Sequence, residues 1–203
     1  MKYDPLTRLL HLCVAAGVTL QLLTSLVMVT PKPGRLANGW FEIHENVGIG
    51  VLVAVAIYWM WVVARAARRA DGGMLFPWFS RRRMADLRDD ALGTLRDVAR
   101  FKLPPDDEPR PLPAAVQGLG LLLVLFMAGT GTILAIGMAP DGAKSAPIHA
   151  VAELHETAAP LMWAYLVGHP LLGFLHQLAG HGSLSRMFGF RAAGTVSRRG
   201  PFV

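Results

Sequence analysis

Four histidines in this chain lie within or at the start of long apolar runs, where an ionisable side chain is costly and usually has a function. They are His11, His44, His155 and His169. The last two are fourteen residues apart in one run. In an α-helix this spacing places both imidazoles on nearly the same face, roughly 21 Å apart along the axis. One helix would thus present an imidazole near each end, and imidazole nitrogens are standard axial ligands of haem iron.

The runs that carry these histidines, together with one further run, are long enough to cross a bilayer as helices, which takes about 20 apolar residues. The four runs cover about 9–29, 44–63, 114–138 and 151–178. We therefore predict an all-α integral membrane protein, a four-helix bundle. The first run could instead be a secretory signal peptide, but it is long for that role and no clean A-x-A cleavage site follows it.

Positive charge is distributed very unevenly along the chain. If the four runs alternate across the membrane, 17 of the 20 Lys and Arg residues fall on the side shared by the N-terminus, the second connection and the C-terminus. The other side holds only Lys32, Arg35 and Lys144. The positive-inside rule then predicts that both termini are cytoplasmic. It also accounts for the net charge of +6, so the basic composition does not indicate nucleic-acid binding.

This orientation gives each histidine a depth in the membrane. His11 and His169 lie near the cytoplasmic ends of their runs, and His44 and His155 lie near the outer ends. Bundle cores commonly hold cofactor sites, so we predict two haems, one between His11 and His169 and one between His44 and His155. The single cysteine, Cys13, and the lack of a CxxCH motif exclude covalent c-type attachment. The predicted cofactor is therefore haem b.

The other histidines and the glycines carry less weight. His176 lies seven residues beyond His169 on nearly the same helical face, and it is an alternative inner ligand. His149 and His181 are expected to be solvated. Glycines near the histidines would let a porphyrin approach the backbone, although ordinary packing between membrane helices explains them equally well. They are Gly48, Gly50, Gly118, Gly120, Gly129, Gly131 and Gly168.

The second connection, between about 64 and 113, contains apolar residues at three- to four-residue spacing. They are Met84, Leu87, Ala91, Leu95 and Val98. This period predicts a short amphipathic helix on the cytoplasmic face of the membrane, and a docking surface for a partner subunit is the alternative. We expect 1–190 to form one transmembrane domain and 191–203 to be a disordered cytoplasmic tail.

Four segments spread over nearly the whole chain carry a further signal. They are RLLHL (8–12), HENVGIGVLV (44–53), LPAAVQGLGLLLVLFMAGTGTIL (112–134) and LHETAAPLMWAYLVGHPLLGFLHQLAGH (154–181). Together they resemble the bacterial cytochrome b561 family, which is related to the cytochrome b subunits of nickel-iron hydrogenases and formate dehydrogenases. The resemblance implies one haem ligand from each of the first two spans and two from the fourth.

Carried onto this chain, the family's ligands are the four histidines named above, in the pairing that their depths predict. One position departs from the family pattern, because Gln117 stands where many relatives have a histidine early in the third span. That position is not one of the four ligands, so the change would not remove a haem. It bears instead on a quinone or proton site near the cytoplasmic face.

Two haems at different depths predict a path for electrons across the bacterial inner membrane, in exchange with membrane quinone. One form is a stand-alone oxidoreductase, such as a superoxide oxidase that passes electrons to ubiquinone, with Lys32 and Arg35 attracting the anion. The alternative is a membrane anchor subunit that links a dehydrogenase, hydrogenase or reductase to quinone. A transporter is a third reading, but it would require acidic or broken-helix sites at mid-membrane, and none is visible.

Overall fold

The computed structural model describes residues 4–69, 76–100, 102, 110–180 and 183–188. Within these ranges the regular elements are helices, and the all-α prediction is confirmed. They are α1 (Pro5–Ser25), α2 (Gly39–Arg69), the short 3₁₀ helix η2 (Pro77–Phe79), α3 (Arg81–Ala99), α4 (Pro111–Gly137), α5 (Ala146–Leu178) and α6 (Ser183–Phe188). The predicted disordered tail, 191–203, and His181 lie outside the described residues.

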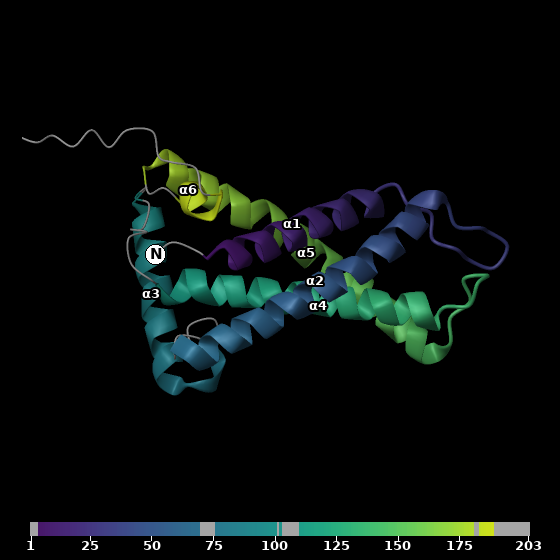
Figure 1. Ribbon diagram of the computed structural model, residues 1–203, viewed down its shortest axis with the longest axis horizontal. Coiled ribbons are helices and arrows are strands. Elements are labelled where there is room, and N and C mark those ends of the chain that lie inside the picture. The colour runs from purple at the N-terminus through teal and green to yellow at the C-terminus, as the bar shows by residue number, and fades with distance from the viewer. Residues whose placement is uncertain (1–3, 70–75, 101, 103–109, 181–182, 189–203) are drawn as a thin grey trace, which may run out of the picture.

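The four long helices α1, α2, α4 and α5 extend along the long axis of the molecule (Figure 1). Each is long and apolar enough to cross a membrane, which confirms the predicted four-helix membrane bundle. α1 packs on α2, α2 on α4, and α4 on α5. α3 lies across one end of the bundle (Figure 1), where it contacts α4. We call this the α3 end, and we call the opposite end, with the connections 26–38 and 138–145, the short-loop end.

The long helices begin a few residues before the predicted spans, and polar caps explain two of these starts. Asp4 accepts a hydrogen bond from the Thr7 amide at 2.8 Å, so it caps α1. Asn38 does the same for α2, because its side-chain oxygen accepts from the Phe41 amide at 3.2 Å. A count of apolar residues does not detect such caps. α1 also ends about one turn earlier than predicted.

The amphipathic helix predicted in the second connection is present as α3, and an ion pair attaches it to the bundle. The Arg110 side chain, just before α4, donates to the Asp90 carboxylate, and both side chains are largely buried. Asp90 also accepts from the Leu112 amide at 2.9 Å and so caps α4. Leu95 and Val98 remain exposed on α3. This exposed apolar surface agrees with a position on the membrane face, which stays a prediction.

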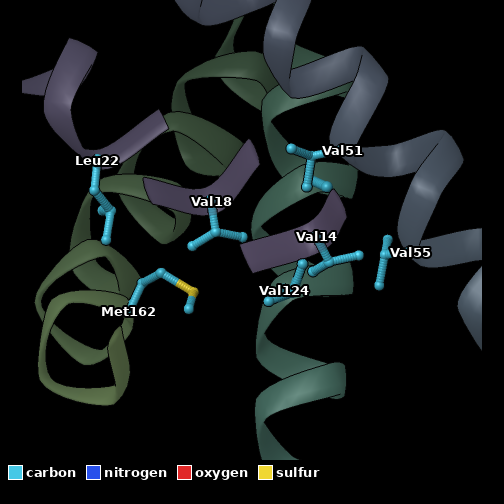
Figure 2. Close-up of a cluster of buried hydrophobic side chains, with 8 residues drawn as sticks. Val14, Val18, Leu22, Val51, Val55, Val124 and Met162 are labelled. Atoms are coloured by element: carbon cyan, nitrogen blue, oxygen red, sulfur yellow. The ribbon is translucent and has the colours of Figure 1, made fainter. Parts of the chain in front are cut away.

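Between the two ends, the core is one cluster of buried apolar side chains from all four long helices (Figure 2). It consists of Val14, Val18, Leu22, Val51, Val55, Val124, Ala128 and Met162. Val55 is completely buried, and Met162 is 3% exposed. Met162 lies seven residues from His155 and seven from His169 along α5. The cluster therefore separates the histidines of the two ends.

Candidate functional site

At the α3 end, two imidazoles from distant parts of the chain lie against each other. His11 of α1 and His169 of α5 have ring centres 6.2 Å apart and ring planes inclined by 51°. A bond between a metal and an imidazole nitrogen is about 2 Å long, so two imidazoles on opposite sides of one metal ion have centres roughly 6 Å apart. The spacing of this pair therefore suits a single iron between the two rings.

Within this pair, one buried ring nitrogen, Nδ1 of His11, has no hydrogen-bond partner among the described residues. His169 stacks on Tyr165, with ring centres 5.3 Å apart and planes within 8° of parallel. The phenol of Tyr165 lies directly on Gly120, where a Cβ atom would overlap it. Gly120 thus permits the position of Tyr165, and Tyr165 orients His169.

A polar network lies one turn before His11, where the start of α1 meets the end of α2. The Thr7 hydroxyl donates to the Asp4 carboxylate at 2.6 Å and accepts from Trp61 Nε1 at 2.9 Å. Arg65 donates to Asp4 at 2.9 Å. Burial raises the pKa of the Asp4 carboxyl, but the hydrogen bonds from Thr7 and Arg65 and the Arg65 charge outweigh burial. The pKa of Asp4 therefore lies below its ordinary value.

At the short-loop end, His44 of α2 and His155 of α5 line the same cavity. Most of its lining is apolar, and its charged lining residues are Lys144, Glu45 and Glu156. Both imidazoles are half-buried. The structure thus brings the predicted outer histidines, His44 and His155, to one cavity between the helices. It brings the predicted inner histidines, His11 and His169, together at the α3 end.

Two threonines that no sequence motif distinguishes contact the histidines of this cavity. Thr24 Oγ1 lies 3.0 Å from Nδ1 of His44, and Thr130 Oγ1 lies 2.8 Å from Nδ1 of His155. Nε2 of each ring makes no hydrogen bond within the described part of the chain and remains available to a metal. A threonine in an apolar helix usually bonds to a carbonyl of its own helix, so its sequence position alone carries no signal.

Two glycines line the histidine cavity, Gly48 on α2 and Gly131 on α4. A Cβ atom at Gly131 would lie 3.3 Å from Cε1 of His155, and one at Gly48 would lie 2.8 Å from Nε2 of Gln21. Glycine at both positions therefore permits the close approach of these two side chains at the cavity wall. Across the described residues, no group of three or more His, Cys, Asp or Glu side chains could hold a metal ion. Paired imidazoles are nonetheless enough for haem, because the porphyrin supplies the other ligands of the iron.

The remaining histidines lie away from the two pairs or beyond one of them. His176 is half-buried in the last turn of α5, about two turns past His169. The ring that lies against His11 is that of His169. His149 is exposed, with Nδ1 at 3.4 Å from the Glu153 carboxylate one turn further along.

Comparison with known proteins identifies a family for the chain. The family model described as prokaryotic cytochrome b561 matches residues 2–190. The matched range includes both histidine pairs and every described helix. The comparisons with curated proteins and with solved structures gave no match.

Proposed function

The chain belongs to the prokaryotic cytochrome b561 family, and on this premise we propose that it is a di-haem cytochrome that exchanges electrons with quinone in the bacterial inner membrane. The family implies haem b and transmembrane electron transfer, and the four apolar helices make the chain a multi-pass membrane protein. One observation carries the finer proposal. Two pairs of imidazoles lie at opposite ends of one bundle, with an apolar cluster between them.

In this proposal each pair of histidines holds one haem. His11 and His169 bind the iron at the α3 end, and His44 and His155 bind the iron at the short-loop end. Haem, when bound, supplies a one-electron couple. The chain positions the imidazoles and excludes water, and it sets the potential through burial and hydrogen bonds to the ligands. Haem at both depths would let electrons cross the membrane in short steps.

The first form of the proposal is a stand-alone quinone oxidoreductase, such as a superoxide oxidase. Two superoxide anions would each lose one electron and leave as O2, and ubiquinone would take up the two electrons with two protons. Lys32 and Arg35 lie in the connection at the short-loop end, and Lys144 lines its cavity. These cations favour the approach of an anion, although Glu45 and Glu156 line the same cavity and oppose it.

A membrane anchor subunit for a separate dehydrogenase, hydrogenase or reductase is the second form. The observation that favours it is α3, which lies across the end of the bundle (Figure 1). The arginines on this helix are exposed. The Asp90–Arg110 ion pair holds this helix in place, so it could present a defined surface to a redox partner. Purified chain that reduces quinone with superoxide alone would support the first form, and dependence on an added dehydrogenase would support the second.

Haem counting tests the shared core of both forms. Protein purified from haem-replete cells should contain two haems b per chain, measured from the reduced spectrum of the extracted haem. His44→Ala and His155→Ala should each lose one haem and keep the other. His149→Ala is the matched control, because His149 is exposed and belongs to neither pair, and it should keep both. A colourless preparation, or variants that keep both haems, would contradict the proposal.

A further inference from the structure

The two histidines at the short-loop end are held by the same local arrangement, contributed by different helix pairs. On α1, the Thr24 hydroxyl donates to the Leu20 and Gln21 carbonyls, both at 2.9 Å. The same oxygen lies 3.0 Å from Nδ1 of His44 on α2. Thr24 is only 1% exposed, so water cannot take its place as a partner of the ring.

The second copy of this arrangement joins α4 to α5. The Thr130 hydroxyl donates to the Phe126 carbonyl at 2.8 Å and to the Met127 carbonyl at 3.1 Å. Its oxygen lies 2.8 Å from Nδ1 of His155. Each threonine thus bonds back to carbonyls three and four residues earlier in its own helix and turns its oxygen toward an imidazole of the next helix.

This arrangement favours one tautomer of each ring. The single hydroxyl proton of each threonine is already donated to its own helix, so its oxygen can only accept from the imidazole. The Gln21 carbonyl, 3.2 Å from Nδ1 of His44, can only accept too. These contacts favour the tautomer with the proton on Nδ1, in which both rings present the lone pair of Nε2.

The pair at the α3 end lacks this support. Nδ1 of His11 is buried without an acceptor among the described residues. His169 is positioned by stacking on Tyr165, which fixes the ring plane but accepts no proton. The two imidazole pairs therefore differ in their hydrogen bonding, because only the histidines at the short-loop end have a threonine oxygen next to Nδ1 in the ranges that the structure describes.

We propose that Thr24 and Thr130 are positioning residues that hold His44 and His155 as Nε2 ligands and make the short-loop haem the lower-potential haem of the two. An imidazole whose N–H donates a hydrogen bond is a more basic ligand, and a more basic ligand stabilises ferric iron. Arginines near the α3 end add to the difference, because positive charge favours reduced haem. The inference rests on the proposed function, since it concerns haems that the histidines would hold.

Redox titration of the purified holoprotein tests this inference. Wild-type protein should titrate as two one-electron components. Thr24→Val and Thr130→Val should each raise the lower potential and leave the upper one in place. We expect up to a tenfold change in the reduction equilibrium for each, which is about 59 mV for one electron. Thr130→Ser keeps the hydroxyl and should restore the wild-type potential. If both valine variants left the lower potential unchanged, the inference would be wrong.

Thr19 offers a matched control on α1. Its hydroxyl bonds back to the Ala15 carbonyl at 2.8 Å, and Thr19 does not line the cavity of His44 and His155. Thr19→Val should therefore leave both potentials unchanged. A shift as large as that of the Thr24 and Thr130 variants would show a general effect of losing a hydroxyl group.

A second measurement does not need haem. In haem-free protein labelled with 15N-histidine, NMR should find His44 and His155 as the tautomer with the proton on Nδ1. Thr24→Val and Thr130→Val should weaken that preference, and the Gln21 carbonyl, 3.2 Å from Nδ1 of His44, should keep part of it in Thr24→Val. The opposite tautomer at either histidine would overturn the inference. Absence of haem from the wild-type protein would instead refute the proposed function, so the two failures can be told apart.

Discussion

The Asp4 carboxylate accepts a hydrogen bond from the Arg65 guanidinium at 2.9 Å, which joins the residue before α1 to the last turns of α2. Asp4 also caps α1 through the Thr7 amide. One side chain therefore fixes both the start of the helix that carries His11 and its contact with α2.

Asp4→Ala should destabilise the bundle at this end. Loss of an N-cap costs about 1 kcal/mol, and loss of the partly exposed ion pair adds less than about 1 kcal/mol. The measurement is the unfolding midpoint of the protein in detergent. Asp89→Ala is the control, because the Asp89–Arg88 pair is far more exposed, at 66% and 72%, and should leave the midpoint unchanged. Equal losses for the two variants would contradict this role of Asp4.

The contribution of Asp4 should depend on pH. Its pKa in the folded protein lies below the ordinary value of 3.8 because hydrogen bonds from Thr7 and Arg65 outweigh burial. A lowered folded pKa means that the stabilisation is complete above about pH 4 and is lost as the pH falls through the folded pKa. The difference in unfolding midpoint between wild type and Asp4→Asn should therefore be constant near neutrality and shrink in acid. A difference that grew in acid would have the wrong sign.

Gly131→Ala should disturb the short-loop haem selectively. The added Cβ would lie 3.3 Å from Cε1 of His155, which forces the ring to shift by a few tenths of an ångström. Gly129→Ala is the matched control, because a Cβ there meets nothing within 4 Å. We expect reduced occupancy or a shifted potential of one haem in Gly131→Ala and a wild-type spectrum in Gly129→Ala. The same spectrum in both variants would argue against close approach of His155 to α4.

His169 and His176 can be separated as candidate ligands at the α3 end. His169→Ala should lose one haem, because His169 is the ring that lies 6.2 Å from His11. His176→Ala should keep both haems, although it removes an imidazole from the same helix. Haem content per chain decides between them. The reverse result would assign the inner ligand to His176.

Asp90→Ala should loosen α3 without loss of haem. Asp90 is the partner of Arg110 and the cap of α4, so its removal breaks two of the contacts between α3 and the start of α4 and leaves the hydrogen bond from Arg110 to Thr94 at 2.7 Å. We expect faster amide exchange across α3 and unchanged haem content. Asp86 is exposed on the same helix, and Asp86→Ala should leave the exchange rates as they are. Unchanged exchange in Asp90→Ala would show that other contacts hold α3.

The fold followed from the sequence because apolar length and charge asymmetry are strong signals for membrane helices. Helical spacing and depth also predicted that His11 would meet His169, and the structure brings these rings together. Their role as haem ligands stays a prediction. Helix starts were predicted less well, because Asp4 and Asn38 act through single hydrogen bonds that a hydropathy pattern does not contain.

The contacts of Thr24 and Thr130 with the imidazoles could not have been predicted from the sequence. Thr24 and Thr130 lie in apolar helices that also contain Thr19 and Thr132, and all four hydroxyls bond back to their own helix. Only the packing of α1 on α2 and of α4 on α5 decides which two face an imidazole. Tyr165 was missed for the same reason, because its stacking on His169 depends on the close approach of α4 at Gly120.

The apolar cluster around Met162 and Val55 has a consequence for the energetics of turnover. None of its side chains is ionisable, so it offers no relay for a proton to accompany an electron between the two histidine pairs. Each transfer would then move a net charge through a layer of low dielectric constant. Such a step works with or against the membrane voltage, at about 2.3 kcal/mol per charge per 100 mV. Turnover in sealed vesicles would be electrogenic, and an imposed voltage would slow or speed it according to its sign.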